Sequence, residues 1–121
     1  MGKKVLIVDD DRVGLALMTA RISKEGFTVL TAANGKVGLE CAIKEKPGLI
    51  VLDIEMPEMN GYTFVLEMKQ QEALKDIPVI VTTAHEENRP IFARRGIKHY
   101  LVKPVQMDEL IGKIVELIGP A

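Results

Sequence analysis

The chain has little of what marks secreted or membrane-spanning proteins. Its 121 residues include one cysteine, Cys41, and no tryptophan. A single cysteine excludes an internal disulfide and fits a reducing compartment. No stretch approaches the ~20 consecutive apolar residues that a membrane-spanning helix needs. The apolar run that follows Lys4 is too short for the core of a signal peptide. We therefore expect a cytoplasmic protein that does not contact the membrane.

The chain also lacks an excess of positive charge. Its formal net charge is -1, whereas a large nucleic-acid footprint needs a basic surface. We therefore expect no direct nucleic-acid binding. Apolar residues make up 47% of the chain and charged residues 27%, as in ordinary globular proteins. A chain of this length builds one sizeable core, so residues 1–121 are predicted to form a single domain.

Short apolar runs alternate five times with stretches of helical spacing. Val and Ile dominate several of the runs, which is typical of parallel strands covered on both faces. Such an alternation predicts an α/β fold, a doubly wound (βα)5 domain with right-handed crossovers. The predicted strands are Lys4–Val8, Thr28–Thr31, Leu49–Leu52, Val79–Thr82 and Tyr100–Val102.

Aspartates follow two of these runs. Asp9 and Asp10 come directly after the first run, and Asp53 comes directly after the third. Because open α/β sheets place their sites outside the carboxyl ends of the strands, these side chains should meet at one edge. Like charges held close together resist joint ionisation, and a bound Mg²⁺, which prefers oxygen ligands, would relieve that repulsion. Asp11 has a simpler interpretation as the N-cap of the following helix.

Asp53 is the candidate nucleophile of this edge. A carboxylate attacks phosphorus to give an acyl phosphate, and phosphoryl transfer otherwise requires mainly positioning and charge neutralisation. Lys103, after the fifth run, supplies a mobile positive charge. Thr83, after the fourth run, supplies a hydroxyl, and the amide of Ala84 supplies a second donor for phosphoryl oxygens.

At these positions the chain resembles the receiver domain of two-component response regulators, in particular the chemotaxis regulators. The resemblance extends from Lys3 to about Ile118. It implies a flavodoxin-like sheet of five parallel strands in the order 2-1-3-4-5. The matching segments are Val8-Asp9-Asp10, Asp53-Ile54-Glu55-Met56-Pro57-Glu58-Met59-Asn60-Gly61, Thr83-Ala84 and Tyr100-Leu101-Val102-Lys103-Pro104.

The resemblance implies a phosphorylation-activated switch rather than an enzyme. Asp53 would take a phosphoryl group from a phosphohistidine on a sensor histidine kinase or a histidine phosphotransfer protein. The domain would catalyse only this transfer and its own dephosphorylation. The residues implied for Mg²⁺ are Asp10, Asp53 and the backbone carbonyl of Glu55, with Asp9 acting through water. Those implied for the phosphoryl oxygens are Thr83 and Lys103.

The resemblance also implies how the signal leaves the domain. Tyr100 would be the switch aromatic, moving inward when Thr83 is drawn towards the phosphoryl group. This exchange would remodel the face formed by the helix near Pro90, the fifth strand and the last helix, and so control a downstream protein. A homodimer through the same face is an open alternative. The peptide bond before Pro104 is expected to be cis.

Two residues beside the expected phosphoryl position remain open in role. Glu55 and His85 lie two residues beyond Asp53 and Thr83, respectively. They are either solvated loop residues or groups that position or repel the hydrolytic water and so set the lifetime of the phosphoryl group.

Pro90 lies where the fourth helix should begin. Proline is accepted in the first turn of a helix but not in its interior. The sequence therefore predicts a short fourth helix, from near Pro90 to a position before Gly96.

The competing function is a Mg²⁺-dependent phosphatase or phosphotransferase that uses the same acids on small phosphate esters. The only feature that favours it is the Asp-x-Glu spacing of Asp53 and Glu55. The chain lacks the length for a cap domain, and no general acid follows Asp53 beside a pocket of substrate size.

Overall fold

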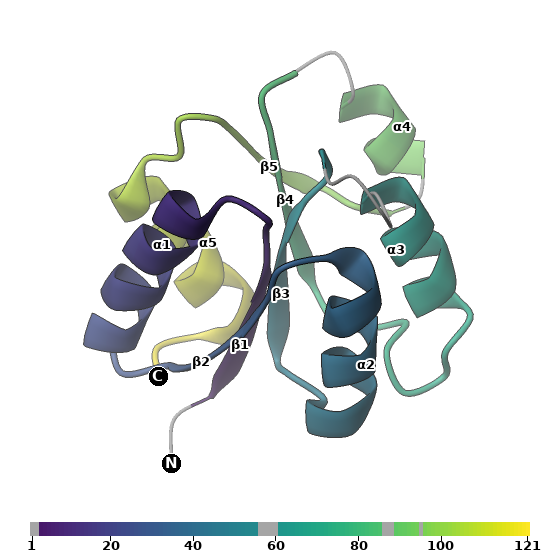
Figure 1. Cartoon of the computed structure of the whole chain (residues 1–121), viewed down its shortest axis with the longest axis horizontal. Helices are drawn as coiled ribbons and strands as arrows, with labels where there is room; N and C mark the ends of the chain where they lie inside the picture. Colours follow the sequence, from purple (N-terminus) through teal and green to yellow (C-terminus); the bar gives the residue numbers. More distant parts are fainter. Residues whose placement is uncertain (1–2, 56–60, 86–88, 95) are drawn as a thin grey trace.

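The computed structural model describes residues 3–55, 61–85, 89–94 and 96–121. Residues 56–60 of the family motif and Arg95 lie outside these ranges. Strands and helices alternate along the described chain (Figure 1). The elements are β1 (Lys4–Val8), α1 (Arg12–Lys24), β2 (Thr28–Ala32), α2 (Gly35–Glu45), β3 (Leu49–Asp53), α3 (Gly61–Lys69), β4 (Val79–Thr83), α4 (Arg89–Arg94), β5 (His99–Val102) and α5 (Met107–Ile118).

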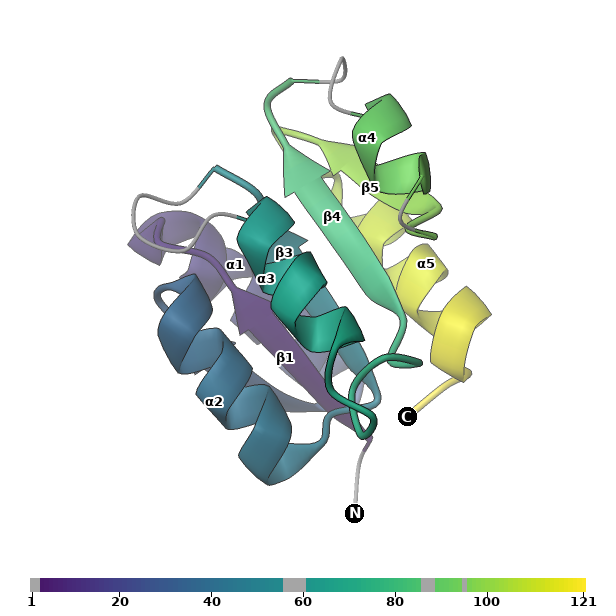
Figure 2. The ribbon, with the colours of Figure 1, turned by 90° about the vertical axis from the view of Figure 1, so that its right-hand side faces the viewer.

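The strands form one parallel sheet in the order β2-β1-β3-β4-β5. This confirms the predicted doubly wound, flavodoxin-like fold. Helices α1 and α5 cover one face of the sheet, and α2, α3 and α4 lie on the other side (Figures 1 and 2). Among the described residues, no helix is long and apolar enough to cross a membrane.

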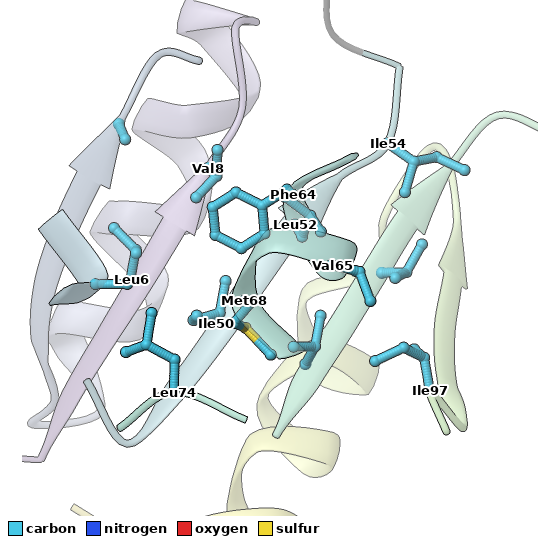
Figure 3. Packing of buried hydrophobic residues seen from close by; sticks show 14 residues of the cluster. Leu6, Val8, Ile50, Leu52, Ile54, Phe64, Val65, Met68, Leu74 and Ile97 are labelled. Carbon is cyan, nitrogen blue, oxygen red and sulfur yellow. The ribbon is translucent and has the colours of Figure 1, made fainter. Parts of the chain in front are cut away.

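The core is divided by the sheet because successive side chains of a strand point to opposite faces. In β1, Leu6 and Val8 pack with Phe64 and Met68 of α3 on one face (Figure 3). The alternate residues Val5 and Ile7 belong to the other cluster, which α1 and α5 cover. Residues 5 to 8 of β1 are fully buried on both sides, which explains why the strand reads as a continuous apolar run.

The ends of the helices follow local signals in the sequence. Asp11 is the N-cap of α1, and its side chain accepts the Val13 N–H at 3.2 Å, as predicted. Helix α2 ends at Glu45, two residues before Pro47, because the residue before a proline disfavours the helical region. The described α4 ends before Gly96, which has a positive φ of 81°.

The register of the sheet aligns the strand ends that carry the predicted site. Val8 of β1 lies beside Leu52 of β3, so the residues that follow them, Asp9 and Asp53, reach the same edge. Across β4 and β5, the last register pair is Thr83 with Val102. The next residue, Lys103, donates its backbone N–H to the Thr83 carbonyl at 2.8 Å, and the Lys103–Pro104 peptide bond is cis.

Gly61 begins α3 at a point where no side chain fits. A Cβ atom at this position would lie 2.6 Å from the Cα of Ile54, and backbone atoms cannot move aside cheaply. We expect Gly61→Ala to lower the free energy of unfolding by about 1–3 kcal/mol, measured by urea denaturation.

Gly112 is the matched control for this substitution. It is an exposed residue of α5, and apart from its chain neighbours and the backbone of its own helix, no atom of the described residues lies within 4 Å of a Cβ built there. Gly112→Ala should raise the free energy of unfolding by about 0.5–1 kcal/mol, because alanine favours a helix interior. Equal effects of the two substitutions would contradict the predicted steric clash.

Candidate functional site

Three carboxylates meet at the carboxyl edge of the sheet. Oxygen atoms of Asp9, Asp10 and Asp53 all lie within 4.8 Å of one another. Asp53 is 1% exposed and Asp9 is 3% exposed, whereas Asp10 faces solvent. The cluster thus has two buried members and one open side, and its oxygens are close enough to share a cation.

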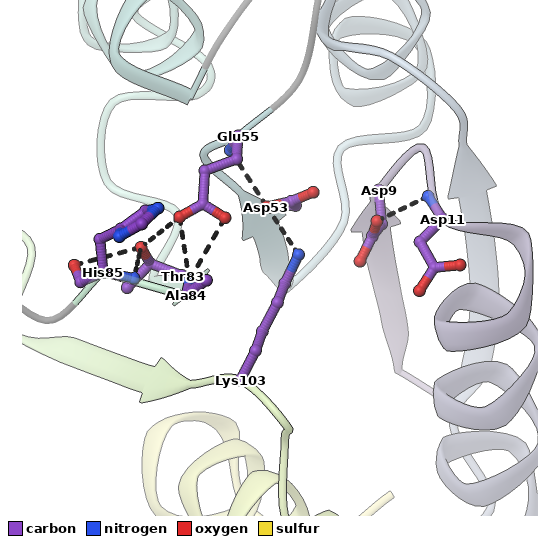
Figure 4. Close-up of polar contacts among 8 residues, drawn as sticks. All are labelled: Asp9, Asp11, Asp53, Glu55, Thr83, Ala84, His85 and Lys103. Carbon is purple, nitrogen blue, oxygen red and sulfur yellow. Dashed lines mark hydrogen bonds and ion pairs between the residues drawn. The ribbon is translucent and has the colours of Figure 1, made fainter.

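Lys103 is the cation that faces this cluster. Its Nζ lies 3.0 Å from Asp53 Oδ1, and the side chain crosses from the end of β5 towards β3 (Figure 4). Burial lowers the pKa of Lys103, but the hydrogen bond and charge of Asp53, with the charges of Asp9 and Glu55, outweigh it and raise the pKa above its ordinary value. Lys103 is therefore charged under all physiological conditions.

Burial and the crowding of the carboxylates both raise the pKa of Asp9. Burial raises its pKa to about 6, and the negative charge of Asp53 adds to the rise. The Asp11 N–H, which donates to Asp9 Oδ1 at 2.9 Å, and the charge of Lys103 act in the opposite direction. A single lysine therefore does not neutralise the described carboxylates.

The loop after β3 holds Asp53 in place. Its Oδ1 accepts the Glu55 N–H at 3.1 Å in addition to the Lys103 contact. The Gly61 N–H donates a hydrogen bond to the Ile54 carbonyl at 3.3 Å. This bond connects the start of α3 to the loop. The carboxylate of Asp53 is thus oriented by backbone and side-chain donors from two different strand ends.

The side chain of Glu55 lies where the sequence alone does not place it. Thr83 Oγ1 donates to Glu55 Oε1 at 2.7 Å, and the Ala84 N–H lies 2.9 Å from Oε1 and 3.3 Å from Oε2 (Figure 4). The sequence predicts that these two donors bind phosphoryl oxygens. The signal that could have suggested the contact is that Glu55 and Thr83 both lie just past the ends of neighbouring strands.

The two remaining candidates lie at the border of the site. The His85 N–H donates to Thr83 Oγ1 at 2.9 Å. Tyr100 is half-buried on β5, packs against the core and donates its hydroxyl to the Ile97 carbonyl at 3.0 Å. These positions suit the predicted roles but do not test them.

A hollow of about 490 Å³ adjoins the acidic edge on the side of α1. Asp9 and Lys103 line it together with apolar side chains that sequence analysis did not single out. Among these, Val13 is 69% exposed and Leu17 is 58% exposed. No periodicity marks them, because α1 combines apolar residues on its inner and outer faces.

The known proteins that this chain resembles include response regulators. The protein is 37% identical over 113 residues to Protein PilH of Pseudomonas aeruginosa, a match that covers 92% of this chain and 93% of PilH. It spans about half the length of several other curated relatives that are named transcriptional regulatory proteins, such as PhoP of Bacillus subtilis and PrrA of Mycobacterium bovis.

Solved structures agree with this result. The chemotaxis protein CheY4 of Vibrio cholerae superposes with a TM-score of 0.90 at 28% identity, covering 97% of this chain and 99% of that one. The receiver domain of the sensor histidine kinase PA1611 of P. aeruginosa, which has a magnesium ion coordinated in its active site cleft, gives 0.89 at 27% identity, with 98% and 99% covered.

The family model of the response regulator receiver domain matches residues 5–115. The matched segment contains all the side chains of the acidic edge, Lys103 and Thr83. The chain belongs to the response regulator receiver domain family, as the match of the family model and the 37% identity to PilH show.

Proposed function

We propose that this receiver domain is a switch controlled by phosphorylation of Asp53. Receiver domains are phosphorylated by histidine kinases and act on downstream targets. The observation that carries the proposal is the 3.0 Å contact of Lys103 with Asp53 Oδ1, beside Asp9 and Asp10. This arrangement places a positive charge against a buried carboxylate, next to the position of an attached phosphoryl group.

In the proposed reaction, a carboxylate oxygen of Asp53 attacks the phosphorus of a phosphohistidine. An O–P bond forms as the P–N bond breaks, and the electron pair of that bond stays on the imidazole nitrogen of the donor. The ammonium of Lys103 neutralises charge on the phosphoryl oxygens, and the Thr83 hydroxyl and Ala84 N–H donate hydrogen bonds to them.

The donor set suits Mg²⁺. Hard carboxylate oxygens are the ligands that Mg²⁺ prefers, and the described site holds more negative charge than Lys103 alone can balance. Asp10, Asp53 and the Glu55 carbonyl would hold the ion, with Asp9 acting through water. When bound, Mg²⁺ would neutralise charge on the transferring phosphoryl group.

The switch itself is proposed to run through Thr83 and Tyr100. Contact of the Thr83 hydroxyl with the phosphoryl group would favour an inward position of Tyr100, which is already half-buried on β5. The surface of α4, β5 and α5 would then change its preferred conformation and its affinity for a partner. His85 and Glu55 remain candidates for setting the phosphoryl lifetime.

The competing enzyme function has less support. A phosphatase of this kind needs a general acid near Asp53, and Glu55, the only candidate from its spacing, has its carboxylate engaged by Thr83 and Ala84. The apolar wall of the hollow at Val13 and Leu17 suits contact with a phosphodonor protein better than a small polar ester.

The proposal predicts covalent phosphorylation at one residue. With acetyl phosphate and MgCl₂, intact mass should show one added phosphoryl group, and peptide mapping should place it on Asp53. Asp53→Asn should abolish the adduct because an amide is not a nucleophile for this reaction.

Asp76→Asn is the matched control, since Asp76 is exposed and lies away from the acidic edge. It should leave the adduct unchanged. Absence of an adduct in the parent protein, or its persistence in Asp53→Asn, would contradict the proposed role of Asp53.

Asp9 predicts an unusual dependence of stability on pH. Its pKa in the folded state is about 6, against 3.8 for an ordinary aspartate, so folding favours the protonated form. Its charge therefore lowers stability progressively as the pH rises from about 4 to 6, and the full penalty remains at about pH 7. Without Mg²⁺, Asp9→Asn should raise the free energy of unfolding at about pH 7 by about 1–3 kcal/mol.

Two further measurements check the cause. The advantage of Asp9→Asn should shrink towards about pH 4, where Asp9 is neutral in both states, and MgCl₂ should stabilise the parent protein more than the variant. Asp11→Asn removes a negative charge two residues away but keeps an N-cap residue, so its effect should stay within about 0.5 kcal/mol. A similar gain in both variants would point to net charge rather than to the buried cluster.

A further inference from the structure

The contacts of Glu55 show a carboxylate held in a site built for an anion. Its Oε1 accepts the Thr83 hydroxyl at 2.7 Å and the Ala84 N–H at 2.9 Å. Thr83 Oγ1 also accepts the His85 N–H at 2.9 Å. The Thr83 hydroxyl has a second acceptor, the His85 carbonyl, at 3.3 Å, but the Glu55 Oε1 contact is shorter by 0.6 Å and its acceptor is a carboxylate. Hydrogen bonds to a charged acceptor are roughly twice as strong as neutral ones.

The same two donors are those that the proposed reaction requires for phosphoryl oxygens. A hydroxyl has one hydrogen, and a backbone amide has one. While the Glu55 carboxylate accepts both, neither is available to another anion. Glu55 comes from the loop directly after Asp53, so its carboxylate and a phosphoryl group on Asp53 would compete for one place.

The exposure of Glu55 makes this competition reversible. Its side chain is exposed, although its carboxylate contacts the buried Thr83. Rotation into solvent would therefore need no repacking of the core, and water would replace the two hydrogen bonds. The cost of leaving the subsite is the loss of these charge-assisted contacts.

We propose that Glu55 is an internal occupant of the phosphoryl-oxygen subsite, and that its carboxylate must leave Thr83 and Ala84 before Asp53 can be phosphorylated. This inference rests on the proposed function of Asp53. It concerns the forward reaction, whereas the lifetime role of Glu55 concerns hydrolysis. Displacement of the Glu55 carboxylate thereby adds to the free-energy barrier of phosphoryl transfer. Until it is displaced, Glu55 keeps Thr83 in the position it has when Asp53 is unphosphorylated.

The test separates occupancy from charge. Glu55→Ala removes the carboxylate, and Glu55→Asp keeps the charge on a side chain that is one methylene too short to reach both donors. With acetyl phosphate and MgCl₂, both variants should form the Asp53 acyl phosphate about tenfold faster than the parent, measured by intact mass over time. Glu40→Ala, which removes a charge from the exposed face of α2, should stay within about twofold of the parent.

A second readout does not depend on phosphorylation. The Ala84 N–H donates a hydrogen bond to a carboxylate, so the resonance of its amide proton should lie downfield in the parent protein. This resonance should move upfield in Glu55→Ala and Glu55→Asp. Glu40→Ala should leave it in place. The same spectra report whether each variant is folded.

The outcomes distinguish the inference from the proposed function. Faster phosphorylation of both Glu55 variants, with the Ala84 shift, supports occupancy. Acceleration of Glu55→Ala but not Glu55→Asp would attribute the effect to repulsion and overturn the inference. Unchanged rates, or an unmoved Ala84 resonance, would overturn it while leaving Asp53 as the phosphoacceptor. No adduct in any variant would overturn the proposed function and the inference with it.

Discussion

The carboxylates of Asp9 and Asp53 repel each other because β1 and β3 pair side by side, Asp9 directly follows β1, and Asp53 is the last residue of β3. The sheet cannot relax this repulsion, since fully buried residues fix both strands on both faces. The contact of Lys103 with Asp53 and the raised pKa of Asp9 are two responses to the same crowding. The stability of the fold therefore maintains a locally unfavourable cluster of negative charge, which a bound cation would relieve.

Glu55 extends this arrangement to a second strand end. Its backbone N–H supports Asp53, while its carboxylate is bound by Thr83 and Ala84. Glu55 thus contacts both the proposed nucleophile, Asp53, and the two hydrogen-bond donors that are proposed to bind the phosphoryl oxygens. This residue connects the loop after β3 to the end of β4, where the proposed switch through Thr83 and Tyr100 would begin.

Particular elements show how far sequence patterns reach. The apolar run of β1 predicted a strand buried on both faces, and Asp11 predicted an N-cap. Pro90 predicted the start of a short α4, and Gly96 predicted its end. These are local properties, because caps, prolines and periodicity act within one or two turns of chain. The convergence of Asp9, Asp53 and Lys103 was predictable too, since parallel strands end at a common edge.

The contact of Glu55 with Thr83 and Ala84 was not predictable from the sequence. Residues 55 and 83 are distant along the chain, and the direction of an exposed side chain depends on which donors a neighbouring loop presents. The sequence by itself determined the fold class, the strand ends and the types of charge at the acidic edge, because these follow from hydrophobic pattern and chain order. Only the tertiary structure decided which donors pair with which carboxylate, because that depends on distances of a few ångströms between segments that folding brings together.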